Sequence, residues 1–186
     1  MKSVKVVVAG GFGTGKTTLV SAVSEIAPLT TEEVLTQASV GVDDLAGVKD
    51  KTTTTVAVDF GRITVNEDIV LYMFGTPGQD RFWFMWDELA RGAIGAIVLV
   101  DTRRLDSSFA AIDYFERRRI PFVVASNMFF GERLYSEDEI RGALRLNPAT
   151  PLVWCDARER DSSKQALIRL IRHTMSQLPT QAPSGR

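Results

Sequence analysis

The sequence predicts an α/β protein with a mostly parallel, six-stranded sheet and helices on both of its faces. Apolar, β-branched stretches alternate with segments of helical period along the chain, which is typical of a parallel sheet covered by helices. A glycine-rich segment separates the first apolar stretch from the first helical segment. The 186 residues suffice for one substantial core, so we expect a single domain over residues 1–178.

The predicted strands and helices alternate along the chain, and one pair of strands is expected to form a hairpin. Strands are expected at residues 5–9, 55–60, 69–74, 96–101, 122–126 and 152–155. Helices are expected at residues 16–26, 79–91, 107–118, 137–146 and 163–177. Ser136 lies three residues before Glu139, the spacing of a capping box at the start of a helix. Phe60, Gly61 and Arg62 predict a hairpin turn, so that one strand runs antiparallel to the others.

The composition is that of an ordinary globular protein and argues against several classes of function. Hydrophobic residues make up 45% of the chain and charged residues 24%, which indicates neither disorder nor a fibrous repeat. The net charge of -1 predicts no broad basic surface, so nucleic acid is not an expected partner. No apolar run reaches the roughly 20 residues that span a bilayer. Any membrane association is therefore expected to be peripheral and to depend on partners.

The sequence also contains a single cysteine and two segments without a regular period. Cys155 cannot close an intrachain disulfide, and with no apolar leader the sequence favours a cytoplasmic protein. Residues 28–51 lack a clear period and are expected to form a mobile loop. Residues 179–186 contain two prolines and a glycine and are expected to form a disordered tail.

The strongest motif runs from Gly10 to Thr17 and has the spacing of a P-loop, with a strand before it and a helix after it. Its glycines let main-chain N–H groups point at phosphate oxygens, and the helix N-terminus adds a positive dipole end. Lys16 is expected to reach the β and γ phosphates, and Thr17 to ligate Mg²⁺. A glycine-rich turn without a ligand is the alternative. Nucleotide contacts are expected from Gly11, Gly13, Thr14, Gly15, Lys16, Thr17 and Thr18.

A second motif runs from Gly75 to Arg81, where a predicted strand ends and a helix begins. It resembles the Pro-Gly-Gln form of the second switch of small GTPases. The resemblance implies that the Gly78 amide meets the γ-phosphate and that Gln79 orients the attacking water, which makes Gln79 and Lys16 the expected catalytic residues. Taken alone, a β-turn with Pro77 at its second position explains the motif equally well.

The threonine run before the second predicted strand resembles the first switch of small GTPases. The resemblance implies that Thr55 ligates Mg²⁺ when a triphosphate is bound, with Thr54 as the second choice. A run of threonines is also simply a good strand former.

Together these motifs cover nearly the whole chain, which resembles the Ras-like small GTPases and their G domain. The similarity extends to the conservon-type GTP-binding proteins of actinomycetes and, more distantly, to the gliding-motility polarity GTPases. It implies GTP and GDP as ligands, Mg²⁺ as cofactor, and a switch that hydrolyses GTP slowly. It also implies a small Roadblock-type regulator or another protein effector as partner.

The base-recognition motif of the family is altered. Its Asn-Lys-x-Asp pattern appears here as Asn127-Met-Phe-Phe130, without the carboxylate that reads guanine. The sequence Asp156-Ala157-Arg158 resembles the last base-contact motif. The resemblance implies that the Ala157 amide points at the purine carbonyl and that Arg158 flanks the ring, which keeps guanine ahead of adenine.

The sequence also differs from the small-GTPase pattern at residues expected to bind the metal and to assist catalysis. Gly75 replaces the aspartate that usually holds Mg²⁺ through water, and Asp59 is the residue that could compensate. Thr54 stands where the gliding-motility type has an arginine, so slow hydrolysis is expected. Lys51, Arg81 and Arg103 are nearby cations in the sequence, but for each of them a solvated surface charge is the simpler interpretation.

The helix after the second motif begins with four closely spaced aromatic residues, Phe82, Trp83, Phe84 and Trp86. One helix face cannot hold all four, so some are expected to be exposed and to contact a partner. Two other functions stay open. One is a nucleotide-binding scaffold with negligible hydrolysis, and the other is a P-loop kinase, which the lack of an arginine-rich lid segment disfavours.

Overall fold

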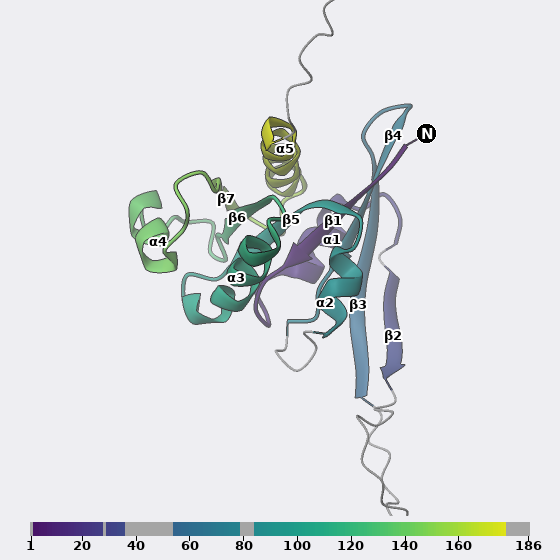
Figure 1. Ribbon diagram of the computed structural model, residues 1–186, viewed down its shortest axis with the longest axis horizontal. Coiled ribbons are helices and arrows are strands. Elements are labelled where there is room, and N and C mark those ends of the chain that lie inside the picture. Colours follow the sequence, from purple (N-terminus) through teal and green to yellow (C-terminus); the bar gives the residue numbers. More distant parts are fainter. Residues whose placement is uncertain (1, 28, 36–53, 79–83, 178–186) are drawn as a thin grey trace, which may run out of the picture.

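A computed structural model describes residues 2–27, 29–35, 54–78 and 84–177, with the backbone alone at 29–35 and 54–57. Figure 1 shows a single sheet with helices packed against it. The strands are β1 (Lys2–Ala9), β2 (Leu29–Leu35), β3 (Thr54–Thr64), β4 (Ile69–Gly75), β5 (Ala93–Val100), β6 (Phe122–Asn127) and β7 (Leu152–Cys155). The helices are α1 (Lys16–Val23), α2 (Phe84–Ala90), the 3-10 turn η2 (Leu105–Ser108), α3 (Phe109–Arg118), α4 (Glu137–Leu144) and α5 (Arg160–Gln177).

The sheet has the order β2-β3-β4-β1-β5-β6-β7 and confirms the predicted fold class. β1 lies at its centre and pairs in parallel with β4 and β5, and β6 and β7 continue the parallel arrangement. β3 runs antiparallel to both β4 and β2. All six predicted strands are present. β2 adds a seventh inside the segment predicted to be a loop, because an edge strand is held by backbone pairing with one neighbour and needs no apolar period.

The predicted hairpin exists, but the predicted position of its turn is wrong. Residues 60–62 lie inside β3, and the chain turns at residues 65–68, where Asn66 Oδ1 accepts hydrogen bonds of 2.9 Å from the N–H groups of Asp68 and Ile69. Gly61 serves a different purpose. A Cβ atom there would lie 2.7 Å from Val20 Cγ1, so the glycine marks the close approach of α1 to the sheet.

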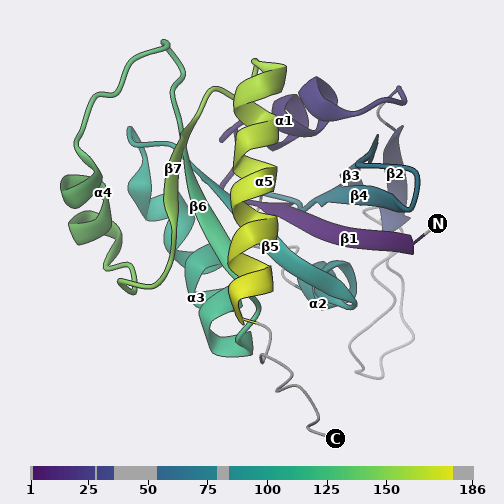
Figure 2. The same ribbon diagram turned by 90° about the horizontal axis from the view of Figure 1, so that it is seen from above.

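Two apolar layers form the core, one on each face of the sheet. Successive residues of β1 alternate between them, with Val6 and Val8 in the layer under α1 and α5, and Val7 and Ala9 in the layer under α2, α3 and α4. Figure 2 shows α1 and α5 on the side of the sheet away from α2 and α3. The two layers explain why residues 6–9 of this strand are all apolar.

The helix ends follow local sequence signals. Ser136 Oγ accepts from the Glu139 N–H at 3.3 Å, and the Ser136 N–H donates to Glu139 Oε2 at 2.8 Å, which confirms the predicted capping box of α4. α4 ends at Leu144, two residues earlier than predicted, and Arg145 follows it in the left-handed conformation with φ of 50°. No helix in the described part of the chain has the length and apolar character to cross a membrane.

Candidate functional site

The candidate site lies at the carboxyl edge of the parallel strands, which is where open α/β sheets bind ligands. Five strands run parallel, so the residues at their carboxyl ends gather along one edge. Those residues include Gly10 after β1, Gly78 after β4, Asp101 after β5, Asn127 in β6 and Asp156 after β7.

The glycine-rich loop between β1 and α1 has the backbone that its sequence predicts. Gly10 and Gly15 have φ angles of 142° and 102°, a region that side chains with a Cβ atom rarely adopt. Both are also closely packed. A Cβ atom at Gly10 would lie 2.3 Å from the Leu99 carbonyl oxygen, and one at Gly15 would lie 2.6 Å from Asn127 Nδ2. The loop conformation and its neighbours therefore both require glycine at these two positions.

Lys16 is buried inside this loop. Its Nζ donates hydrogen bonds to the carbonyl oxygens of Gly10 at 3.0 Å and Gly11 at 2.6 Å. Burial lowers the pKa of Lys16 to about 8, and the nearby Asp59 carboxylate offsets part of this effect. An ammonium group that has lost its water, and whose hydrogen bonds to described residues go to two neutral carbonyls, is well placed to bind an anion such as a phosphate.

The end of β4 is brought against the same loop. A Cβ atom at Gly78 would lie 2.8 Å from both Lys16 Nζ and Phe12 Cα. The residue expected to meet the γ-phosphate therefore lies beside the lysine expected to bind it. Gln79, the expected catalytic partner, falls outside the described residues. So do Phe82 and Trp83, whereas Trp86 is buried and Phe84 is 60% exposed at the start of α2.

Thr17 and Asp59 form the part of the site that suits a divalent cation. Thr17 Oγ1 donates a hydrogen bond of 2.6 Å to Asp59 Oδ2, and Asp59 is buried in β3. In the sheet register Asp59 pairs with Gly75, where a Cβ atom would lie 3.0 Å from Asp59 Cβ and Oδ2. Gly75 thus leaves the room that the Asp59 side chain occupies.

This donor set fits Mg²⁺. The ion prefers oxygen ligands and is usually bound by one or two carboxylates together with phosphates and water. Thr17 and Asp59 would hold it, and when bound it would neutralise charge on the phosphates. Thr55, the other expected ligand, pairs with Val34 at the start of β3, a part of the strand for which the backbone alone is described.

Asn127 joins the phosphate loop to the loop after β7. Its Nδ2 donates to the Thr14 carbonyl oxygen at 2.9 Å, and its Oδ1 accepts from the Ala157 N–H at 3.1 Å. Three residues predicted separately from the sequence are therefore in direct contact. Thr18, also predicted to bind nucleotide, is exposed in the first turn of α1.

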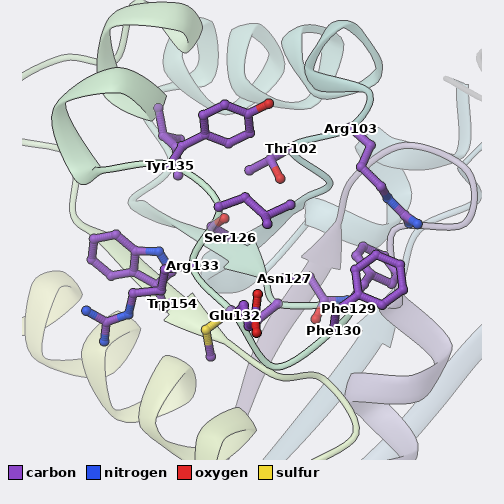
Figure 3. Close-up of a pocket in the computed structure, with 13 residues that line it drawn as sticks. Thr102, Arg103, Ser126, Asn127, Phe129, Phe130, Glu132, Arg133, Tyr135 and Trp154 are labelled. Carbon is purple, nitrogen blue, oxygen red and sulfur yellow. The ribbon is translucent and has the colours of Figure 1, made fainter.

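The part of the site where the sequence predicts a nucleotide base is aromatic and cationic. Arg158 forms a two-pronged ion pair with Asp156, at 2.9 Å to Oδ1 and 2.7 Å to Oδ2, which holds the pKa of Asp156 below its usual value. Phe130 is 70% exposed at the position where the small GTPases that the sequence resembles carry a base-reading carboxylate. Figure 3 shows the Arg103 guanidinium beside the rings of Phe129 and Phe130, at 4.1 and 5.6 Å from their centroids.

The cavity drawn in Figure 3 is not large enough for a base. It lies among residues that follow β5 and β6, including Thr102 and Tyr135, together with Trp154 of β7, and has a volume of about 20 Å³. That volume is enough for a water molecule. A purine would have to lie outside this cavity.

The segment after β5 was not predicted to belong to the site, but it packs against the phosphate loop. Asp101 is fully buried and accepts from Arg103 Nε at 2.8 Å and Nη2 at 2.9 Å. Arg103 is thus an exposed surface charge, as expected, with 45% of its side chain accessible, but it is also ion-paired with this buried carboxylate. Arg104 Nη2 donates to the Phe12 carbonyl oxygen at 3.0 Å. An aspartate directly after an apolar parallel strand was the available signal in the sequence, because such positions lie at the binding edge.

Comparison with known proteins identifies the family. The sequence matches a family described as conserved hypothetical ATP binding protein over residues 8–177. The chain belongs to this family. It is 32% identical over 126 residues to the uncharacterized protein MJ1339 of Methanocaldococcus jannaschii, which covers 67% of this chain and 69% of that protein. The match establishes a nucleotide-binding protein of the P-loop type.

A solved structure with the same fold is the cytosolic domain of the T. maritima FeoB iron transporter in its apo form. The TM-score is 0.64 at 15% sequence identity, and the alignment covers 97% of this chain and 67% of that chain. At this identity the likeness supports the fold alone.

Proposed function

We propose that this family member is a nucleotide-dependent molecular switch that binds GTP and GDP with Mg²⁺ and hydrolyses GTP slowly. The observation that carries the proposal is the position of Gly78 beside Lys16 and Phe12. A γ-phosphate bound at Lys16 would have to contact the segment after β4. The position of that segment would then depend on whether a triphosphate or a diphosphate is bound, which is how nucleotide switches work.

The pairing of Thr17 with Asp59 supports the metal requirement. Nucleotide phosphates carry several negative charges, and a single buried ammonium at Lys16 cannot neutralise them. Thr17 and Asp59 offer oxygen ligands beside that lysine. We therefore expect triphosphate to bind as its Mg²⁺ complex, with Thr55 as a further ligand in that state.

The nucleotide base is expected to lie near Asn127 and Ala157. The hydrogen bond from Ala157 to Asn127 holds both residues beside the phosphate loop, where the family resemblance expects a purine. We propose guanine as the preferred base on this resemblance. Adenine is the specific alternative. It is favoured by the family description. It is also favoured because the Asp156 carboxylate is already paired with Arg158, which leaves it less able to accept hydrogen bonds from guanine.

Hydrolysis is proposed to depend on Gln79, which would orient the attacking water. Positioning of this kind gives slow turnover until a partner completes the charge stabilisation, and we expect a rate well below about 1 s⁻¹ for the isolated protein.

We also propose that a Roadblock-type regulator or another effector binds near the start of α2. The exposed Phe84 supports a protein contact there.

The decisive experiment is a titration with fluorescent GDP and fluorescent ADP, each with Mg²⁺ and with EDTA. We expect tighter binding of the guanine nucleotide and a clear gain in affinity with Mg²⁺. Single-turnover assays with GTP and with ATP would then measure hydrolysis, with Gln79→Ala as the variant and the exposed Gln177→Ala as its control. Equal binding of both bases would overturn the guanine assignment. Turnover that Gln79→Ala leaves unchanged would favour the nucleotide-binding scaffold.

A further inference from the structure

Two adjacent arginines after β5 both lie near one buried carboxylate, but only one of them is closely paired with it. Arg103 binds both oxygens of Asp101, at 2.8 and 2.9 Å. Arg104 lies farther away, with Nη2 3.5 Å from Asp101 Oδ2. The same nitrogen of Arg104 donates to the Phe12 carbonyl oxygen at 3.0 Å, and the Arg104 side chain is 51% exposed. One carboxylate therefore compensates for two cations, and the less tightly paired of them lies on the phosphate loop.

The contact made by Arg104 is on the γ-phosphate side of the loop. Phe12 Cα and Lys16 Nζ would each lie 2.8 Å from a Cβ atom at Gly78, so these three residues are close together. Lysines at this position of a P-loop reach the β and γ phosphates. Arg104 Nη2 would also lie 3.2 Å from a Cβ atom at Gly13. Arg104 thus borders the residue 12–13 segment, which Gly78 contacts as well.

A second contact fixes the arginine segment to the loop. Ser107 Oγ donates to the Arg104 carbonyl oxygen at 2.8 Å. The same hydroxyl would lie 2.4 Å from a Cβ atom at Gly11, so Ser107 packs directly against the phosphate loop. The backbone of Arg104 is therefore held in place. Its side chain is already held by the Phe12 carbonyl oxygen, so nucleotide binding does not have to pay for ordering it.

We propose that Arg104 is a positioning residue for phosphoryl transfer, which fixes the residue 12–13 segment and supplies positive charge in cis at the γ-phosphate end. The inference rests on the proposed function. In the reaction a water oxygen forms a bond to the γ phosphorus as the bond to the β–γ bridging oxygen breaks. The diphosphate keeps the electron pair, and both water protons end on the released phosphate. Charge that develops on the bridging oxygen is stabilised by fixed N–H groups and nearby cations.

The experiment compares Arg104→Met and Arg104→Lys with the control Arg117→Met. Arg117 is an exposed arginine of α3, paired with Asp113 one helical turn away. We expect Arg104→Met to slow single-turnover GTP hydrolysis by about 10- to 100-fold, which is less than the roughly 100- to 1,000-fold lost when a donor that directly contacts the developing charge is removed. The affinity for GDP should change less than about threefold, because positioning acts on the transferring group. Arg104→Lys should be intermediate, and Arg117→Met should match the wild type.

Several outcomes would overturn the inference. An unchanged hydrolysis rate in Arg104→Met would do so, and so would a loss of GDP affinity as large as the loss of rate, which would indicate a purely structural support. If the wild type binds GTP but does not hydrolyse it, the proposed hydrolysis fails. The ratio of GTP to GDP affinity then tests Arg104, because charge at the γ-phosphate end predicts a lower ratio in Arg104→Met, and an unchanged ratio refutes that role.

Discussion

The hydroxyl of Thr17 donates to the carboxylate of Asp59 at 2.6 Å, which joins the first turn of α1 to the middle of β3. The family resemblance expects this carboxylate at position 75, on the neighbouring strand. Asp59 and Gly75 are paired in the sheet register, so a carboxylate on either strand could reach the same place. The side chain on β3 occupies the space that the glycine on β4 leaves open.

The first prediction concerns this carboxylate. Asp59→Asn should weaken the Mg²⁺-dependent part of triphosphate affinity by about 10- to 100-fold, as the loss of a supporting metal contact commonly does. Affinity measured in EDTA should change little. Asp68→Asn, in the exposed turn after β3, is the control. An equal loss of affinity with and without Mg²⁺ would contradict the assignment.

A variant with the two residues exchanged tests the same point by gain of function. Gly75→Asp alone should destabilise the protein, because its Cβ atom would meet Asp59 at 3.0 Å and two carboxylates would share one site. Combining it with Asp59→Gly removes both conflicts and should restore much of the Mg²⁺ dependence lost in Asp59→Gly. Nucleotide titrations over a range of Mg²⁺ concentrations would measure the recovery.

The second prediction follows from Lys16. Burial lowers the pKa of Lys16 to about 8, so the free protein loses this proton as the pH rises through about 8. A bound phosphate favours the charged form and raises the pKa again, so binding takes up protons above that pH and affinity falls there. At about pH 8.5 we expect an uptake of roughly 0.8 proton per nucleotide from Lys16. Calorimetry in buffers of different ionisation enthalpy would measure it, and Lys16→Met should lack this component.

The phosphate loop could be predicted because all its information is local. Its glycines are needed for their own backbone angles, and the flanking strand and helix have clear periods. The misplaced turn at Gly61 shows the limit of such reasoning. A glycine between two apolar runs indicates a turn or a close contact equally well, and Val20, which decides the matter, is 41 residues away in the sequence.

The role of the segment after β5 could not be predicted for the same reason. Asp101, Arg103 and Arg104 form an ordinary charged group in the sequence. Their importance comes from the parallel pairing of β1 with β5, which places Arg104 beside Phe12, 92 positions earlier. Strand order is not encoded in local patterns, so contacts across the sheet edge became visible only in the fold.

The third prediction concerns base choice at Phe130. Phe130→Asp places a carboxylate where the small GTPases that the sequence resembles read guanine, and paired polar contacts discriminate between substrates better than apolar ones. We expect the ratio of GDP to ADP affinity to rise by at least about tenfold, a difference of about 1.4 kcal/mol. Phe130→Leu removes the ring without adding a charge and should leave the ratio near its wild-type value. If both variants change the ratio equally, Phe130 acts by shape and does not occupy the position of the missing carboxylate.

The last prediction separates two glycines by what surrounds them. Gly61→Ala should lower the free energy of unfolding by about 1–3 kcal/mol, because the new methyl group would lie 2.7 Å from Val20 Cγ1 and 3.2 Å from Met73 Cε. Gly142, inside α4, has no atom within 4 Å of the equivalent position. Gly142→Ala should therefore raise the free energy of unfolding by about 0.5–1 kcal/mol, since alanine loses less backbone entropy in a helix. Urea denaturation of both variants would measure the difference. Similar effects at the two positions would mean that α1 can move away from β3 at little cost, and that close packing is not what excludes a side chain at Gly61.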